Sequence, residues 1–400
     1  MTHPTTLLRF SASGHRSIDG MVEIDLDPAG DAPACALALL GANGSGKTSV
    51  LSAPAFMRDA VLHSCDAWAA RDPQLDPRPL PVEPFALRRV PEPSSFEADV
   101  LLGDTVWTYG FELSGDRVLS EWLRSEDGEG AERLWIDRDA DRGPLTRDAF
   151  DPGLAHADLL ATVTRADALV LSAAGLINHA QLAPLFAWFR DNLHTLTPTG
   201  AADQDRTLQA LRENSAARRA LSHLLHATDQ NIAGITLNTD TGELVFAHGS
   251  PGRPGGGLTW AQQSGGTRTT VTLLHAALRA LRTGTVLLVD DFGSSLHPHL
   301  AAEMVRLFTD TELSNTRGAQ VVLATHTATV LGDGVQHLLA PHEIVLVEKH
   351  DDGATRAAAL SDFHIGERED LRRSYLQGAF GGVPHLLEGR LPRELHATAL

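Results

Sequence analysis

The segment Gly41-Ala-Asn-Gly-Ser-Gly-Lys-Thr-Ser49 has the spacing G-x-x-x-x-G-K-[ST], which is typical of a phosphate-binding loop. In such a loop, backbone N–H groups surround the phosphates, the lysine reaches the β and γ oxygens, and the next hydroxyl binds Mg²⁺. The chain has only two lysines, Lys47 and Lys349. Lys47 lies in the loop, where phosphate binding requires a compact ammonium that the broad guanidinium of arginine cannot replace. The predicted phosphate-binding residues are Asn43, Gly44, Ser45, Gly46, Lys47, Thr48 and Ser49.

The flanking sequence agrees with this interpretation. An apolar run, Cys35–Leu40, precedes the loop and predicts a buried strand. A helix is expected from about Thr48 to Ala60, with Pro54 as a kink. Strand, loop and helix in this order predict that the chain binds a nucleoside triphosphate with Mg²⁺. We expect ATP, because the sequence has no Asn/Thr-Lys-x-Asp guanine motif.

A second apolar run, Thr285–Val289, ends in Asp290 and Asp291. A buried parallel strand with carboxylates at its end is typical of the second half of a nucleotide site. We expect Asp290 to hold Mg²⁺ through water, beside Thr48. Asp291 is expected to orient or deprotonate the attacking water.

Two further segments are predicted to face the phosphates. His326 follows a predicted strand, Gln320–Ala324, and at that position it can reach the γ-phosphate or the attacking water. A Ser-Gly-Gly-Thr turn precedes an apolar helical pattern, where the serine can cap the helix and the glycines permit close approach of the backbone to an anion. The residues of this turn are Ser264, Gly265, Gly266 and Thr267.

Composition limits the classes of protein. With 400 residues and 42% hydrophobic content, the chain can bury a large core. It has no apolar run of about 18 residues and no signal-peptide pattern, and its two cysteines do not make a disulfide framework, so we expect a cytoplasmic protein without a membrane partner. The formal charge of −18 does not indicate a nucleic-acid partner, although a local basic groove would permit one.

The remaining sequence predicts an α/β protein in three parts. Residues 1–114 are expected to form the N-terminal part of an ATPase head, residues 115–257 a compact helical lid or lever, and residues 258–400 the C-terminal part. Strands are predicted at Leu7–Phe10, Val22–Leu26, Phe96–Leu102, Val106–Leu113, Arg133–Asp137, Gly234–Asn238 and Glu243–Ala247. Helices are predicted at Leu159–Trp188 and Asp203–His226, a surface loop at Asp72–Pro93 and a flexible break at Gly249–Gly257.

The order of the motifs resembles a known family. Phosphate loop, Ser-Gly-Gly-Thr turn, paired acids and His326 are similar to the ABC-type ATPase head that SMC and RecF proteins share. Further segments resemble hallmarks of the stand-alone AAA/ABC-type ATPases related to the OLD and abortive-infection proteins of bacterial phage defence. These segments are Phe10-Ser-Ala-Ser-Gly-His-Arg-Ser17, Ser295-Leu-His-Pro298, Val347-Glu-Lys349 and Tyr375-Leu-Gln-Gly-Ala-Phe-Gly-Gly-Val-Pro384. The resemblance implies a P-loop NTPase fold of the ABC/SMC-head type, with a mixed central sheet flanked by helices and a compact, mainly helical insertion.

The resemblance also implies a homodimer or higher homo-oligomer that holds ATP between two heads. The Ser264–Thr267 turn of one subunit would contact the γ-phosphate bound by Lys47 of the other. In the opening motif, Arg16 is the candidate for a contact on the adenine or phosphate side. Asp291 departs from the family, which usually has Glu there, and its shorter side chain implies slow hydrolysis.

Three functions are compatible with these residues. The first is an ATP-driven switch in phage defence that controls a separate nuclease or toxin, because the Asp-x-Asp pair of the OLD nuclease does not follow Glu348. The second is a RecF/SMC-like ATPase of DNA repair or recombination. It needs a basic track, for which Arg206, Arg212, Arg218 and Arg219 are candidates, but interleaved acids favour a solvated face. The third is a nucleotide-gated scaffold that does not hydrolyse ATP.

Overall fold

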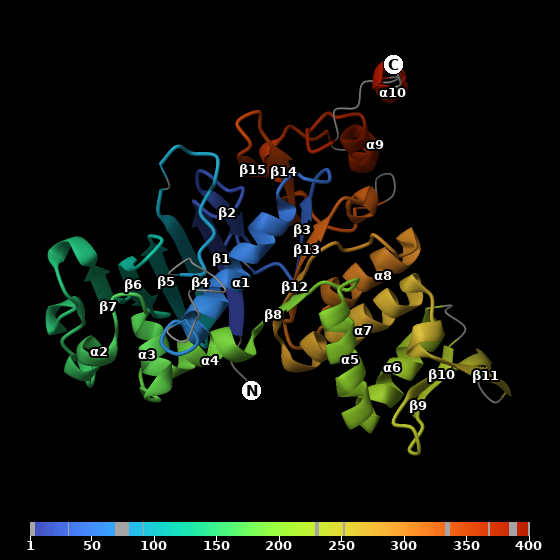
Figure 1. Cartoon of the computed structure of the whole chain (residues 1–400), viewed down its shortest axis with the longest axis horizontal. Helices are drawn as coiled ribbons and strands as arrows, with labels where there is room; N and C mark the ends of the chain where they lie inside the picture. The colour runs from blue at the N-terminus through green and yellow to red at the C-terminus, as the bar shows by residue number, and fades with distance from the viewer. Residues whose placement is uncertain are drawn as a thin grey trace.

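The strand before the phosphate loop, β3 (Ala36–Leu40), lies inside a mixed sheet in the middle of the molecule (Figure 1). The computed structural model describes residues 5–30, 32–68, 80–90, 92–228, 232–250, 253–332, 337–366, 369–383 and 390–398. The order of strands in this central sheet is β15 (Thr355–Ala359), β14 (Ile344–Lys349), β3, β13 (Gln320–Thr325), β12 (Val286–Val289) and β8 (Leu193–Leu196). All neighbours are parallel except β15, which pairs antiparallel with β14.

Alternate residues of β3 enter two separate hydrophobic cores. Leu37 and Leu39 belong to one core, and Ala36, Ala38 and Leu40 belong to the other. A strand covered on both faces has no polar side to alternate with, which explains its continuous apolar sequence.

The first core is closed by an antiparallel sheet. Its strands, in spatial order, are β2 (Val22–Asp25), β1 (Thr5–Ser13), β4 (Ser94–Leu102), β5 (Thr105–Leu113), β6 (Val118–Glu126) and β7 (Glu132–Asp139). Helix α1 (Lys47–His63) lies between the two sheets and contacts β1, β4, β8 and β13. Helices α3 (Val170–Leu176) and α4 (Ala183–Asp191) pack beside it, and α2 (Ala157–Val163) packs on α3.

The second core lies on the opposite face of the central sheet, on the right in Figure 1. Its helices are α5 (Ala201–Glu213), α6 (Ser215–Ala227), α7 (Gly265–Thr283) and α8 (Pro298–Thr309). A small antiparallel sheet with the order β11 (Arg253–Thr259), β10 (Leu244–Ser250) and β9 (Ile232–Leu237) packs on α6. Helices α9 (Leu371–Leu376) and α10 (Arg390–Thr398) complete the described chain, and no described helix has the length and apolar character to span a membrane.

One buried amide joins the two large sheets. Gln320, at the start of β13, accepts a hydrogen bond from Leu7 N at 2.8 Å and donates to Leu7 O at 2.9 Å. It also donates to Ala34 O at 3.1 Å. The side chain therefore supplies the backbone partners that Leu7 would otherwise find in a neighbouring strand.

The central α/β fold and most predicted elements agree with the structure, but the middle of the chain contains strands that the sequence did not reveal. Strand β6 was missed because Glu121 interrupts its apolar pattern. Glu121 is fully buried and accepts hydrogen bonds from Tyr109 Oη at 2.9 Å and from Val170 N at 2.8 Å. It lies 3.5 Å from the guanidinium of Arg138. In the sequence, a glutamate at this position suggests exposure to solvent. In the structure, the Glu121 carboxylate is buried and lies at the amino-terminal end of α3, where the helix dipole favours a negative charge.

The single helix predicted at Asp203–His226 is two helices. Asn214 separates α5 from α6, and its side chain accepts a hydrogen bond from Ala217 N at 3.0 Å as the cap of α6. Arg218 donates to Leu211 O at 2.6 Å at the end of α5, so it does not extend a basic track. The four arginines of this region do not lie on one continuous helix face.

The predicted break at Gly249–Gly257 is also wrong, because residues 249 and 250 belong to β10 and residues 253–257 to β11; residues 251 and 252 lie outside the described residues. Residues 72–79 and 91 of the expected Pro-rich loop lie outside them too, and its described residues, 80–90, 92 and 93, form no helix or strand, as expected. The segment 115–257 is not purely helical, since β6 and β7 extend the first sheet and β8 joins the central one. The three-part division of the chain thus stays an interpretation of the sequence, and the sheets do not break at its boundaries.

Substitution of Gln320 tests the joint between the sheets. We expect Gln320→Leu to lower the free energy of unfolding by about 3 kcal/mol, because Leu7 and Ala34 lose buried hydrogen-bond partners. The matched control is Gln209→Leu on α5, whose exposed side-chain amide donates a hydrogen bond to Glu213. Denaturant unfolding of both variants measures the difference, and equal stability of the two would contradict a role for Gln320 as the joint.

Candidate nucleotide-binding site

The phosphate loop connects β3 to α1 and is shaped by glycines. Gly44 and Gly46 have φ values of 81° and 104°, a region that favours glycine. Gly41 must also lack a side chain, because a Cβ there would come within 2.2 Å of Val347 O. A Cβ at Gly44, in contrast, would meet nothing within 4 Å, so the loop is open where phosphates approach.

Lys47 is the first residue of α1, and its ammonium folds back over the loop. Lys47 Nζ donates to Gly41 O and to Ala42 O, each at 2.8 Å. Burial lowers the pKa of Lys47, and the negative charges of Asp290 and Asp291 oppose this shift. The cation predicted from the sequence is therefore held at the loop and faces both acids.

The residues predicted to bind Mg²⁺ converge across 242 positions of sequence. Thr48 Oγ1 donates to Asp290 Oδ1 at 3.1 Å, at the point where α1 begins and β12 ends. A hydroxyl and a carboxylate are oxygen ligands of the kind that Mg²⁺ prefers. Ser45 Oγ is buried without a hydrogen-bond partner in the described part of the chain. These groups fit a Mg²⁺-bound phosphate chain.

Thr325 holds the three predicted motifs together. Its carbonyl accepts a hydrogen bond from Gly41 N at 3.3 Å, and its hydroxyl donates to Phe292 O at 2.8 Å. His326 follows directly and is exposed at the edge where the parallel strands end. Sequence reasoning did not single out Thr325, since its partners lie far away along the chain.

Asp291 has an unusual backbone. Its φ is 54°, in the left-handed region, and its N–H donates to Asp290 Oδ1 at 3.0 Å. Aspartate is among the residues that tolerate this region best. The strained turn directs the two carboxylates differently: Asp290 is bonded to Thr48, whereas the Asp291 side chain is exposed.

The Ser-Gly-Gly-Thr turn caps α7 as the sequence predicts. Ser264 Oγ accepts from Thr267 N at 3.1 Å, and Ser264 and Gly265 are exposed. A Cβ on Gly266 would lie 3.1 Å from Ser295 O, so the turn packs beside the segment that follows the paired acids. Its expected contact with the nucleotide of a second subunit stays a prediction.

Arg16 points to a different partner from the one predicted. Its Nε donates to Glu83 Oε2 and its N–H to Glu83 O, both at 2.7 Å. The neighbouring His15 is buried and hydrogen-bonded to Ser52 Oγ of α1 at 2.9 Å. Burial lowers the pKa of His15 to about 4, so this ring is neutral at pH 7. His15 of the opening motif thus packs against the first turns of α1. The predicted contact of Arg16 with the nucleotide stays a prediction.

A hydroxyl cluster behind the loop was missed in the sequence. Thr355 Oγ1 donates to Ser45 O at 3.1 Å and lies 2.7 Å from Ser17 Oγ, which in turn donates to Ser49 Oγ at 2.8 Å. Gly46 allows this approach, because any side chain there would collide with Thr355. Threonine and serine have no motif spacing here, so only the fold reveals the cluster.

The Gly-Gly loop after α9 also approaches the strand before the phosphate loop. Gly382 N donates to the Glu348 carboxylate, and Tyr375 Oη donates to Gly382 O at 2.9 Å. A Cβ on Gly382 would lie 3.8 Å from Leu40 O, one residue before the loop. Glu348 is therefore engaged by backbone, and burial followed by the Glu348 charge raises the pKa of Tyr375 to about 12. Pro384, the last residue of this predicted motif, lies outside the described residues.

The fold and the site define a P-loop ATPase of the α/β class. Residues 37–332 match the family described as "AAA domain, putative AbiEii toxin, Type IV TA system". This match covers more than half of the chain, and the chain belongs to that AAA family. The family resemblance and fold class expected from the motifs are therefore confirmed.

Solved structures match only weakly. The recombination mediator protein RecF with ATP, of the RecFOR pathway, is 12% identical with a TM-score of 0.37, and the match covers 90% of this chain and 99% of RecF. For cbiO1 from Clostridium perfringens, part of the ABC transporter complex cbiONQ, the identity is 12%, the TM-score 0.33 and the coverage 98% of both chains. Similarity this low carries no argument about function. No curated protein matches the chain.

Removal of one hydroxyl tests the cluster behind the loop. We expect Thr355→Val to weaken ATP binding roughly fivefold, because the loss of a hydrogen bond to the loop costs about 1 kcal/mol. Thr236→Val, at an exposed position of β9, is the control. Calorimetric titration with ATP measures both affinities, and an unchanged affinity in Thr355→Val would show that the cluster does not shape the loop.

Proposed function

We propose that the chain is an ATP-binding and slowly hydrolysing conformational switch. The observation that carries the proposal is the hydrogen bond from Thr48 to Asp290 beside the Lys47 ammonium. These three groups are what a Mg²⁺-bound triphosphate requires, and they meet at the carboxyl edge of a parallel sheet.

Binding would exchange internal contacts for contacts to phosphate. The Lys47 ammonium, now bonded to two loop carbonyls, would turn to the β and γ oxygens. Thr48 would bind the metal directly and Asp290 through water. When bound, Mg²⁺ supplies positive charge to the phosphate oxygens. The backbone N–H of Gly44, an exposed residue of the loop, would complete the phosphate cradle.

Asp291 is the candidate base. Its exposed carboxylate would orient a water molecule and accept the proton as that water attacks the γ-phosphorus, giving ADP and phosphate. Aspartate is one methylene shorter than glutamate, and a misplacement of about 1 Å can cost on the order of 10²-fold in rate. His326, exposed at the same edge, would contact the γ-phosphate or that water.

A second copy of the chain would complete the site. The Ser264–Thr267 turn presents exposed Ser264 and Gly265 at the start of α7, where N–H groups and the helix dipole favour an anion. Contact of this turn with the γ-phosphate held by Lys47 of another subunit would make ATP part of a homodimer or higher homo-oligomer interface. Hydrolysis would then open the interface.

We place this switch in bacterial defence against phage by abortive infection, in the cytoplasm, with a separate nuclease or toxin as effector. The description of the family, which names a putative AbiEii toxin and a type IV toxin–antitoxin system, supports this setting. The carboxylate of Glu348 is bonded to Gly382 N, which argues against a nuclease metal site at this position. An effector on another chain is therefore the simpler arrangement.

The mass of the purified protein with and without ATP and Mg²⁺ tests the switch. We expect Asp291→Asn to accumulate an ATP-dependent dimer or larger assembly with little phosphate release, because the nucleotide is bound and not cleaved. Lys47→Ala should remain at its nucleotide-free mass. Assembly that is indifferent to ATP in both variants would contradict the proposed interface. Undiminished turnover by Asp291→Asn would remove Asp291 as the base.

The biological role is tested in the source cells. We expect Lys47→Ala at the native locus to raise the plating efficiency of restricted phages at least tenfold, because the effector is no longer controlled by ATP. Survival after DNA damage is measured in the same strains. Unchanged plating together with sensitivity to DNA damage would favour the alternative, a RecF/SMC-like ATPase acting in repair or recombination.

A further inference from the structure

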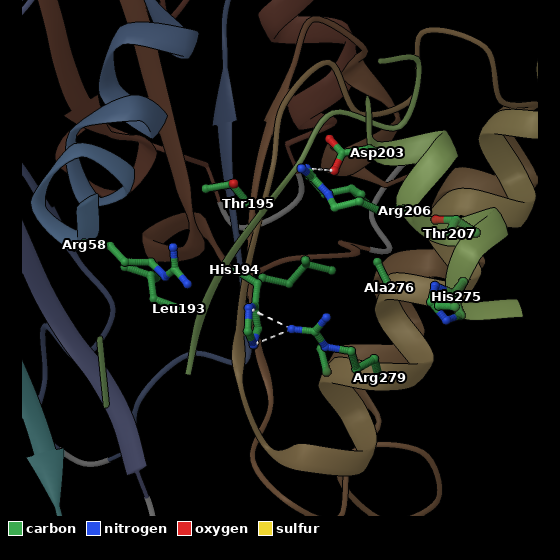
Figure 2. A pocket seen from close by; sticks show the side chains of 14 residues that line it. Arg58, Leu193, His194, Thr195, Asp203, Arg206, Thr207, His275, Ala276 and Arg279 are labelled. Atoms are coloured by element: carbon green, nitrogen blue, oxygen red, sulfur yellow. Dashed lines mark hydrogen bonds and ion pairs between the residues drawn. The ribbon is translucent and has the colours of Figure 1, made fainter. Parts of the chain in front are cut away.

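A cationic pocket lies at the outer edge of the central sheet and shares no residue with the phosphate loop (Figure 2). Its volume is about 370 Å³, which is within the range of small-molecule sites. Strand β8 is the last strand of the sheet, and α1, α5 and α7 supply the other walls. The basic residues of the lining are Arg58, His194, Arg206, His275 and Arg279.

Within the described part of the chain, Arg279 forms no ion pair with a carboxylate. Its Nη2 lies 2.9 Å from both ring nitrogens of His194. A guanidinium only donates, so the ring nitrogen that receives this hydrogen bond must be unprotonated. Burial, and then the charges of Arg279 and Arg58, lowers the pKa of His194 to about 4. The pair therefore carries the whole positive charge of Arg279 at neutral pH.

Arg58 approaches from α1 on the other side of β8 (Figure 2). Its Nη2 donates to Arg190 O at 3.2 Å, but its Nε is buried and has no hydrogen-bond partner in the described chain. Burial lowers the pKa of Arg58, against the nearby charges of Asp59 and Asp191. Asp191 itself is bonded to Arg190. An exposed arginine needs no partner because water solvates it, but a buried Nε does.

Among the described residues that line the pocket, the one acid already has partners. Asp203 accepts from Thr197 N at 2.8 Å and forms an ion pair with Arg206. Within the described residues, no carboxylate lies at ion-pair distance from Arg58 or Arg279. Two guanidinium groups without ion pairs in one pocket are unexpected in a chain with a formal charge of −18.

We propose that this pocket binds a small phosphate-bearing anion, a phosphate ester or polyphosphate, between Arg58 and Arg279. Two guanidinium groups that line one cavity match an anion with several oxygens and at least two charges. An anion close to His194 would raise the pKa of its ring, so binding takes up a proton and strengthens as the pH falls toward 5. The titratable and charged groups that line the pocket with His194 are Arg58, Asp203, Arg206, His275 and Arg279, and Asp191 also acts on the His194 ring.

The ligand would touch both elements that lead to the ATP site. Leu196 O, at the end of β8, accepts a hydrogen bond from Asp290 N at 2.9 Å. Helix α7, which carries Arg279, begins at the Ser264 turn. Occupation of the pocket would thus change the rate of ATP turnover, a consequence that rests on the proposed ATPase, whereas the binding itself does not.

Calorimetric titration of the Lys47→Ala protein with pyrophosphate, without Mg²⁺, tests the pocket separately from the phosphate loop. We expect one site per chain, with at least tenfold weaker binding when Arg58→Gln or Arg279→Gln is added. Arg282→Gln, an exposed residue of α7 outside the pocket, is the charge-matched control and should leave the affinity unchanged. Absence of binding, or equal weakening by all three substitutions, overturns the proposal.

Two further measurements keep the test decisive if a variant is unstable. Titration of the Lys47→Ala protein at pH 6 in two buffers of different ionisation enthalpy reports proton uptake, which we expect on pyrophosphate binding; its absence removes His194 from the site. Citrate is the carboxylate probe. Binding of citrate as tight as that of pyrophosphate would overturn the assignment to a phosphate ligand.

Discussion

The parallel register of β3, β13 and β12 is the constraint on which the rest of the molecule depends. Parallel strands end at one edge, so the residues that follow them, the phosphate loop, His326 and Asp290, must meet there. Thr325 reinforces this arrangement by bonding to the residues that follow both neighbouring strands. Any shift in register would separate Thr48 from Asp290 and disperse the site.

Polar contacts at both ends of the parallel strands maintain this register. Gln320 joins β13 to the first sheet at the amino end, and the Thr355–Ser17 hydroxyl cluster supports the loop at the other end. The contacts are polar, buried and directional, so they define one arrangement where apolar packing alone would tolerate several. Strand β8, at the edge of the same sheet, forms one wall of the cationic pocket.

The predictions that succeeded were local. The loop spacing, the apolar strands on either side of it and the capping serine of α7 are each read from fewer than about ten neighbouring residues. The predictions that failed have two causes: in one segment a distant partner overrides local preference, and in another a local cap ends the helix. Glu121 interrupts the apolar pattern of β6, and it is stable in the core because Tyr109 and the start of α3 donate hydrogen bonds to it and Arg138 lies beside it. Asn214 divides one predicted helix, since its side chain makes a better cap than a helical residue.

The sequence by itself determined the class of the protein and the chemistry of its loop, because a P-loop is a short segment whose spacing sets its own backbone. It also determined the order of motifs along the chain. Only the tertiary structure decided that Thr325, Gln320 and Thr355 support the site, and that Arg58 and Arg279 face one cavity. Arg58 and Arg279 are 221 positions apart in the sequence. Gln320, Thr325 and Thr355 each have a hydrogen-bond partner more than 280 positions away. Contacts over such distances leave no local pattern, because they exist only when the sheet has brought remote segments together.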